Sequence, residues 1–285
     1  MKKIIFLLLL TFIAANVYAQ TNADLQKIYD TEKAFERVAA EKGLNQSFVE
    51  FSAPDGICFF PGYPVNCREY FKAQSASPAF LTWNPTFIDI SSNGALGYSI
   101  GNSVFRPKGK DTADAIYGQY LSIWQRQPDG NFRAVLDTGI SHAKPDKLET
   151  DWKSSADTGK ELNAGKSSAA DNVNSFFETA TRGGLNKAYK IYAAEDVRAL
   201  RENQFPITGK SNLLAETKKD KSTVSFAKRS VFFGAADMAY ITNSYALTKK
   251  DNTTEKGNFV QVWKLRGGKW LLVMDVFVPT AGNQS

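Results

Sequence analysis

Two aspartates that border apolar segments are the first candidates for chemistry in this sequence. Asp137 ends a run rich in aromatic and β-branched residues, and Asp55 follows an apolar segment with helical spacing. A carboxylate in an apolar cavity can act as a general base when a nearby donor stabilises the developing charge. Several tyrosines could supply that donor: Tyr29, Tyr63, Tyr98 and Tyr120. Asp55 and Asp137 are therefore the catalytic candidates, although an aspartate at a strand end can instead cap a turn or pair with a surface arginine.

A serine motif is the second candidate. The residues GYSIG at 97–101 match the G-x-S-x-G pattern, and Asp137 and His142 follow in the order found in hydrolases. That mechanism needs the serine on a sharp turn from a strand into a helix. Residues 102–107 instead continue an extended run that ends at a proline. The pattern therefore does not predict a nucleophile.

Metal and redox chemistry have few candidate residues. His142 is the only histidine, so a site built on several histidines cannot form within one chain, and we predict no metal and no cofactor. Cys58 and Cys67 are the only cysteines. In an oxidising compartment they could form a disulfide across a small loop, and two buried free thiols are the alternative. The sequence leaves both states open.

The elements that must position these residues occur twice. Residues 118–137 and 257–275 each consist of two aromatic and β-branched runs joined by a short turn that contains glycine. Such a pattern is typical of a β-hairpin. When the two segments are aligned, Trp124 matches Trp263 and Asp137 matches Asp275. We interpret this as an internal duplication.

Each half of the chain begins with helical spacing. The apolar face predicted for residues 24–42 consists of Leu25, Ile28, Phe35 and Val38. Residues 173–180 repeat this spacing, and Gly43 and Gly184 end the two predicted helices. Long extended segments follow in both halves, so the order of helices first and strands second predicts an α+β fold.

The N-terminus has the pattern of a secretory signal. Lys2 and Lys3 precede an apolar run at residues 4–15, and a small-residue cleavage pattern ends at Ala19. The run is shorter than the ~20 residues that a membrane-spanning helix needs. We therefore expect residues 1–19 to be removed after Ala19 and the protein to be periplasmic or secreted, with no membrane contact afterwards.

Composition divides the remaining chain into two domains. Residues 143–165 are rich in Lys, Asp, Ser, Gly and Ala, which is typical of a surface linker, so the predicted domains are residues 21–142 and 166–280. The formal net charge is +6, but basic residues alternate with acidic ones and form no dense run. This charge pattern predicts no binding to nucleic acid.

Several segments carry a resemblance to a known family: residues 83–85, 96–101 and 117–140 in the first half, and 196–198, 205–210 and 257–275 in the second. Together with the order of elements, they resemble the nuclear transport factor 2-like superfamily, which includes ketosteroid isomerase, scytalone dehydratase and the SnoaL-like polyketide cyclases. The uncharacterised bacterial branch is the most similar. The resemblance implies two tandem cone-like domains, each a curved antiparallel or mixed sheet wrapped around N-terminal helices. It also implies an intramolecular pseudo-dimer or a homodimer that pairs through the sheets.

The resemblance leaves the reaction open, because the catalytic residues of the isomerases cannot be mapped motif by motif. We expect a non-catalytic protein that binds a small apolar or amphipathic molecule in a cone pocket. Six residues are the candidates for ligand binding: Phe35, Phe60, Trp83, Tyr98, Trp124 and Arg198. The alternatives are a ketosteroid isomerase-like isomerase or lyase that uses a pocket carboxylate, and a protein-interaction module.

Overall fold

The structure is a computed structural model that describes residues 23–60, 62–155, 168–227 and 231–280. The secretory signal predicted at residues 1–19 lies outside these described residues. No helix in the described part of the chain is both long enough and apolar enough to span a membrane.

The first half has the predicted α+β order of helices and strands. Its helices are α1 (Ala23–Lys42), α2 (Leu44–Phe51) and α3 (Cys67–Ala73). Its strands are β1 (Ser52–Cys58), β2 (Val65–Asn66), β3 (Phe80–Ile90), β4 (Leu96–Arg106), β5 (Ile116–Arg126), β6 (Phe132–His142) and β7 (Lys153–Ser154). They form a seven-stranded sheet in the order β2-β1-β6-β5-β4-β3-β7, in which β1 runs parallel to β6 and β3 to β6 form an antiparallel meander.

The second half repeats this plan. Its helices are α4 (Ala169–Gly183), α5 (Leu185–Tyr192) and α6 (Lys210–Thr217). Its strands are β8 (Ala193–Arg201), β9 (Ile207–Thr208), β10 (Thr223–Phe226), β11 (Val231–Ala235), β12 (Met238–Thr248), β13 (Thr254–Arg266) and β14 (Lys269–Pro279). The sheet order is β10-β12-β13-β14-β8-β9, and β11 also pairs with β12. The parallel pair of β14 and β8 corresponds to the pair of β6 and β1.

The long helix in each half ends at a glycine, as the sequence predicts. Gly43 has a φ of 89° and Gly184 has a φ of 82°, and each also precedes the second helix. With ψ values of 163° and 160°, both lie in a backbone region that is essentially restricted to glycine. These two glycines allow the chain to turn from α1 into α2 and from α4 into α5 without a linker.

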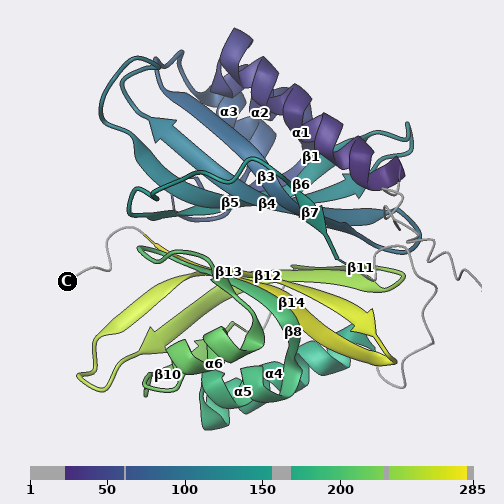
Figure 1. Cartoon of the computed structure of the whole chain (residues 1–285), viewed down its shortest axis with the longest axis vertical. Helices are drawn as coiled ribbons and strands as arrows, with labels where there is room; N and C mark the ends of the chain where they lie inside the picture. The colour runs from purple at the N-terminus through teal and green to yellow at the C-terminus, as the bar shows by residue number, and fades with distance from the viewer. Residues whose placement is uncertain (1–22, 61, 156–167, 228–230, 281–285) are drawn as a thin grey trace, which may run out of the picture.

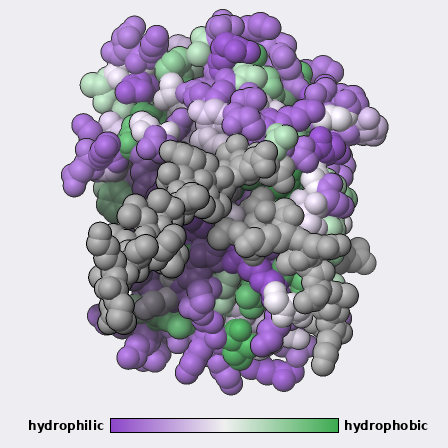
Figure 2. Space-filling view, turned by 45° about the vertical axis from the view of Figure 1, so that its right-hand side comes forward, coloured by the Kyte–Doolittle hydropathy of each residue, from purple (hydrophilic) through white to green (hydrophobic). Residues whose placement is uncertain are grey.

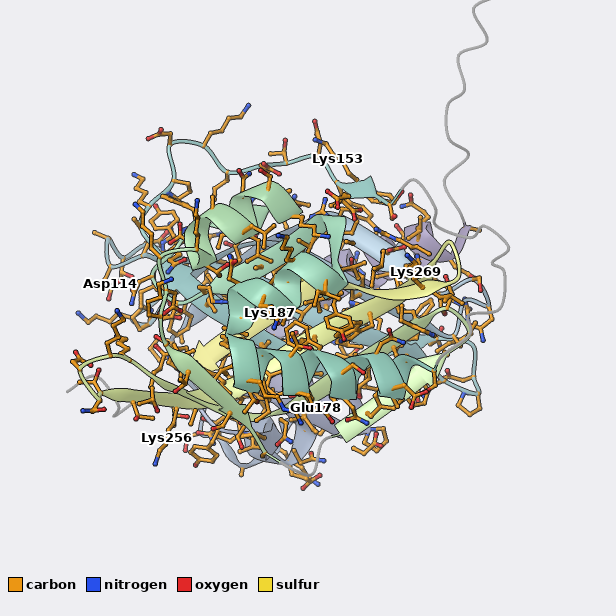
Figure 3. All side chains as sticks on the ribbon, turned by 90° about the horizontal axis from the view of Figure 1, so that it is seen from below. Asp114, Lys153, Glu178, Lys187, Lys256 and Lys269 are labelled. Carbon is orange, nitrogen blue, oxygen red and sulfur yellow. The ribbon has the colours of Figure 1, made fainter. Side chains whose placement is uncertain are left out.

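The two sheets pack face to face, and the helices cover their outer sides (Figure 1). One core cluster combines residues of both domains, for example Tyr98 and Ile123 with Tyr240 and Val262. Two further clusters lie between each sheet and its own helices. Figure 3 shows α4 and α5 lying across the second sheet, with Glu178 and Lys187 on these helices. Each domain is thus a curved sheet wrapped around its helices.

A buried ion pair joins the domains. The Nζ atom of Lys264 in β13 lies 2.6 Å from Oδ1 of Asp89 in β3, and both side chains are fully buried. The same Nζ atom donates a hydrogen bond to the Ile90 carbonyl oxygen at 3.1 Å. Removing one partner of such a pair would leave a buried charge without compensation, so breaking this contact would destabilise the packing of the two sheets.

The segment between the halves also contributes to the first sheet. Residues 153–154 form β7, which pairs in parallel with β3 at Phe87 and Ile88. Nearby, the amide of Asn84 donates to the carbonyl oxygen of Thr150 at 3.0 Å, and the amide of Asn102 donates to that of Glu149 at 2.7 Å. Part of the predicted linker is therefore attached to the first domain.

Candidate ligand-binding site

A cavity of about 730 Å³ lies in the first domain between the sheet and the helices α2 and α3. Its apolar wall includes Phe48, Phe60, Phe71, Leu81, Phe105 and Ile140. Asp137 and Tyr120 also line it, whereas exposed polar residues such as Lys42 and Gln74 surround the open side. An apolar cavity with a few polar groups is the usual form of a small-molecule site.

Asp137 is the acidic group in the cavity wall. Its side chain projects from β6, is only 8% exposed, and accepts a hydrogen bond at 2.6 Å from Oγ of Ser122 on the adjacent strand. Burial, together with the nearby carboxylate of Glu32, raises the pKa of Asp137 to about 7, against the opposing effect of the Ser122 hydrogen bond. Asp137 can therefore be either neutral or charged near neutral pH.

A second carboxylate, Glu32 of α1, lies behind the cavity and is fully buried. It accepts hydrogen bonds from Nε1 of Trp83 at 2.7 Å and from Oγ of Ser99, which in turn accepts one from Nε1 of Trp124 at 2.8 Å. Burial raises the pKa of Glu32 to about 7 although these donors oppose the shift. The serine of the GYSIG motif thus holds a buried carboxylate on a continuous strand, and is not placed as a nucleophile.

Tyr120 lies close enough to both acidic groups to be influenced by their charges. Tyr120 lines the cavity wall. Its hydroxyl is buried near Glu32 and Ser99 but is not aligned to form a hydrogen bond with a described residue. Burial and the surrounding carboxylates raise the pKa of Tyr120 well above its usual value, so the hydroxyl stays protonated. It is a neutral donor within the same cone as Asp137.

Glu32 was missed from the sequence, although a signal was present. It lies four residues after Ile28 and three before Phe35, both on the apolar face of the predicted helix. This spacing places a charged residue on the buried side of an amphipathic helix. The aligned position in the second half is Val173, which is also buried.

Of the predicted ligand-binding residues, Phe60 lines the cavity. Phe35, Trp83 and Trp124 pack together beneath it, with the Phe35 ring 4.8 Å from Trp83 and 6.5 Å from Trp124. These three side chains support the cavity from the core and are not among the residues that line it.

The structure places Tyr98 and Arg198 away from the cavity. Successive side chains of a strand point to opposite faces of the sheet, so Ser99 faces the helices and Tyr98 faces the other domain. The guanidinium carbon of Arg198 lies 3.6 Å from the centre of the Phe87 ring, also between the sheets. Asp55 is exposed and does not line the cavity either.

The two cysteines are buried free thiols in the structure. A hydrogen bond with Cys67 and burial raise the pKa of the Cys58 thiol far above its usual value. Within the described residues, no group of three or more His, Cys, Asp or Glu side chains could hold a metal ion.

The second domain has a different environment around the aligned aspartate. Asp275 is fully buried and accepts hydrogen bonds from the hydroxyl of Tyr189 at 2.6 Å and from Nε2 of Gln261 at 2.9 Å. Its Oδ2 atom also forms an ion pair with Nη2 of Arg201. This carboxylate is therefore neutralised within the chain.

Large side chains also fill the second cone. Phe277 and Gly139 occupy equivalent positions, two residues beyond the aligned aspartate. Tyr245 of β12 and Ser103 of β4 are also equivalent, because each lies opposite the first glycine of its hairpin. The rings of Phe277 and Tyr245 lie 4.5 Å apart. The first cone has a glycine and a serine at these positions, which leaves room for the cavity.

Comparisons with known proteins relate this chain to solved structures only, because no family model and no curated protein match it. It is similar to an NTF2-like protein of unknown function from Shewanella oneidensis, at 18% identity over 38% of this chain and 93% of that chain, with a TM-score of 0.32. It is also similar to an NTF2-like protein from Cytophaga hutchinsonii, at 12% identity over 40% of this chain and 99% of that chain, with a TM-score of 0.34. An NTF2-like protein of unknown function from Pseudomonas putida matches at 14% identity over 38% of this chain and 81% of that chain, with a TM-score of 0.33. Each of these matches covers 38–40% of this chain.

Proposed function

We propose that the first domain binds a small, mainly apolar molecule in the cavity that Asp137 and Tyr120 line. The observation that carries this proposal is the open cone, because the same fold in the second domain fills the corresponding space with Phe277 and Tyr245. A duplicated fold with one open and one filled cone indicates that the cavity is not a requirement of folding.

A substitution that copies the second domain tests this proposal. Ser103→Tyr should fill the cone, and Gly118 opposite it leaves the space that Gly257 leaves beside Tyr245. We expect native mass spectrometry to detect a small molecule that co-purifies with the wild type and is absent from this variant. Ser244→Tyr, at an exposed position of β12, is the matched control and should keep the molecule.

If Ser103→Tyr folded normally and retained the molecule, the cavity would not be its binding site. The same proposal places the protein in the periplasm or outside the cell, which rests on the N-terminal sequence alone. Removal of residues 1–19, read from the mass of the purified protein, tests that part independently.

Proton transfer within the same cavity is the second candidate function. The observation in its favour is a buried carboxyl group, Asp137, with a pKa of about 7 in a cavity wall that also carries the Tyr120 hydroxyl. A base of this kind can remove a proton next to a carbonyl group while a donor stabilises the enolate oxygen. Exchange of the α-protons of cyclohexanone in heavy water, followed by NMR, should then depend on Asp137 and be lost in Asp137→Asn.

A role as a protein-interaction module has less support. It would require an exposed apolar face on one of the sheets, whereas these faces pack against each other. The surface in Figure 2 is mostly hydrophilic, with apolar residues scattered over it.

A further inference from the structure

We infer that the ligand of the first cone is an organic cation, an amine or guanidine carried on an apolar body. This inference rests on the proposed function and names the class of molecule that the cavity would take. It follows from the second domain, in which the protein places a cation of its own at the equivalent point.

Arg201 of β8 acts as the internal cation of the second cone. Its Nη2 atom pairs with Oδ2 of Asp275 and donates to the hydroxyl of Tyr189 at 2.7 Å. Its Nη1 atom donates to the carbonyl oxygen of Asp275 at 2.8 Å. The guanidinium carbon lies 4.3 Å from the centre of the Phe277 ring. The aspartate is thus paired with a cation that stacks on an aromatic ring.

The first cone keeps the aspartate and lacks this cation. Arg201 lies two residues beyond the β8 residue that pairs with Asp275, and Phe60 lies two residues beyond the β1 residue that pairs with Asp137. Phe60 is therefore the counterpart of Arg201, and it lines the cavity without a charge. Among the described residues, no lysine or arginine forms an ion pair with Asp137.

The charges around the first cone favour a cation. Asp137 and the nearby Glu32 are both acidic, whereas the cationic residue in the described cavity lining is Lys42, which is exposed. A buried carboxylate without a cationic partner is costly, and a cation that enters the cavity would offset that cost. The aromatic side chains Phe48, Phe60 and Phe71 would pack against the apolar body of the ligand, and their ring faces would contact its cationic group.

A matched series of ligands tests the inference on the full-length mature protein. Isothermal titration calorimetry at about pH 8 would compare hexylamine, hexanol and hexanoate, which have the same chain length and differ in charge. We expect hexylamine to bind at least about tenfold more tightly than hexanol, because a hydrogen bond to a charged group contributes at least this factor. Hexanoate should bind most weakly.

Two substitutions and one control variant test whether the preference depends on Asp137. Asp137→Asn keeps the acceptor for Ser122 and should lower the affinity for hexylamine to that for hexanol, with hexanol unchanged. Asp55→Asn, at an exposed position of the same domain, is the matched control and should change neither affinity. Phe60→Arg should place a cation beside Asp137, as Arg201 does beside Asp275, and abolish hexylamine binding in a folded protein.

The outcomes separate this inference from the proposed function. Equal affinities for the three ligands, or tighter binding of hexanol or hexanoate, would overturn the organic cation and leave the cavity as a binding site. Binding of hexylamine that Asp137→Asn does not weaken would also overturn it. If none of the three ligands bound, the inference would fail, and the co-purified molecule and the Ser103→Tyr variant would still decide whether the cavity binds a ligand.

Discussion

Asp137 and Asp275 show how surroundings change the role of one residue type. They lie at equivalent positions within β6 and β14, and both are buried. Asp275 has Arg201, Tyr189 and Gln261 as partners, whereas Ser122 is the donor to Asp137. The carboxyl group of Asp137 therefore remains available at the cavity wall, whereas the carboxyl group of Asp275 is bound by side chains of the core.

Glu32 should make stability depend on pH. Because burial raises its pKa from 4.5 to about 7, the folded protein keeps a proton between these values that the unfolded chain has lost. The free energy of unfolding should therefore fall as the pH rises from about 4.5 to about 7 and level off above that. A shift of this size corresponds to about 3 kcal/mol.

The Glu32→Gln variant isolates this contribution. Urea unfolding at a series of pH values should show a smaller decrease for the variant than for the wild type. Glu41→Gln, at an exposed position on the same helix, is the control and should retain the wild-type slope. Equal slopes for wild type and Glu32→Gln would show that Glu32 titrates normally.

Some of the residues that the sequence offers as candidates line the cavity and others do not, for definable reasons. The sequence offers Asp137 because it ends an apolar run and Phe60 because it is an aromatic residue of the expected cone, and both line the cavity. Tyr98 could not be assigned to a face, because a shift of one residue in strand register exchanges Tyr98 with Ser99. The contrast of Gly139 with Phe277 is visible in the aligned halves, but it acquires meaning only when their positions in the cone are known.

At the scale of elements, the helical pair in each domain forms one side of the cone. The long helix carries its apolar face to the sheet, and the second helix reverses direction at a glycine with positive φ. The fold at this level could be predicted, since helical spacing, glycine stops and repeated hairpins all agreed. The edge strand β7 could not, because two polar residues in a segment rich in Lys and Ser carry no strand pattern.

Adjacent glycines at the end of α4 allow a direct test of this turn. Gly184→Ala should destabilise the protein by roughly 1–3 kcal/mol, because its backbone conformation is strained for any residue with a Cβ atom. An added Cβ atom there would meet no atom within 4 Å, so the cost would come from the backbone alone.

Gly183→Ala is the matched control, since it lies within the helix and a Cβ atom would only displace the flexible side chain of Lys187. It should be close to neutral in thermal or urea unfolding. If the two variants had the same stability, the turn at Gly184 would not need glycine.

The whole molecule combines two copies of one fold with different interiors. The sheets bury their faces against each other and are joined by the Lys264–Asp89 pair, so the helical sides remain outward. Both domains contribute a sheet face to this packing, but the described cavity of about 730 Å³ lies in the first domain. We expect duplication to have left one domain for packing and one for binding.

The stoichiometry of a neutral apolar probe tests this account most directly. Fluorescence titration of the protein with Nile red should give one site per chain, because one cone is open and the other is filled by Tyr245, Phe277 and Arg201. The site should disappear in Ser103→Tyr. Two equivalent sites per chain, or one site that Ser103→Tyr leaves intact, would contradict the account.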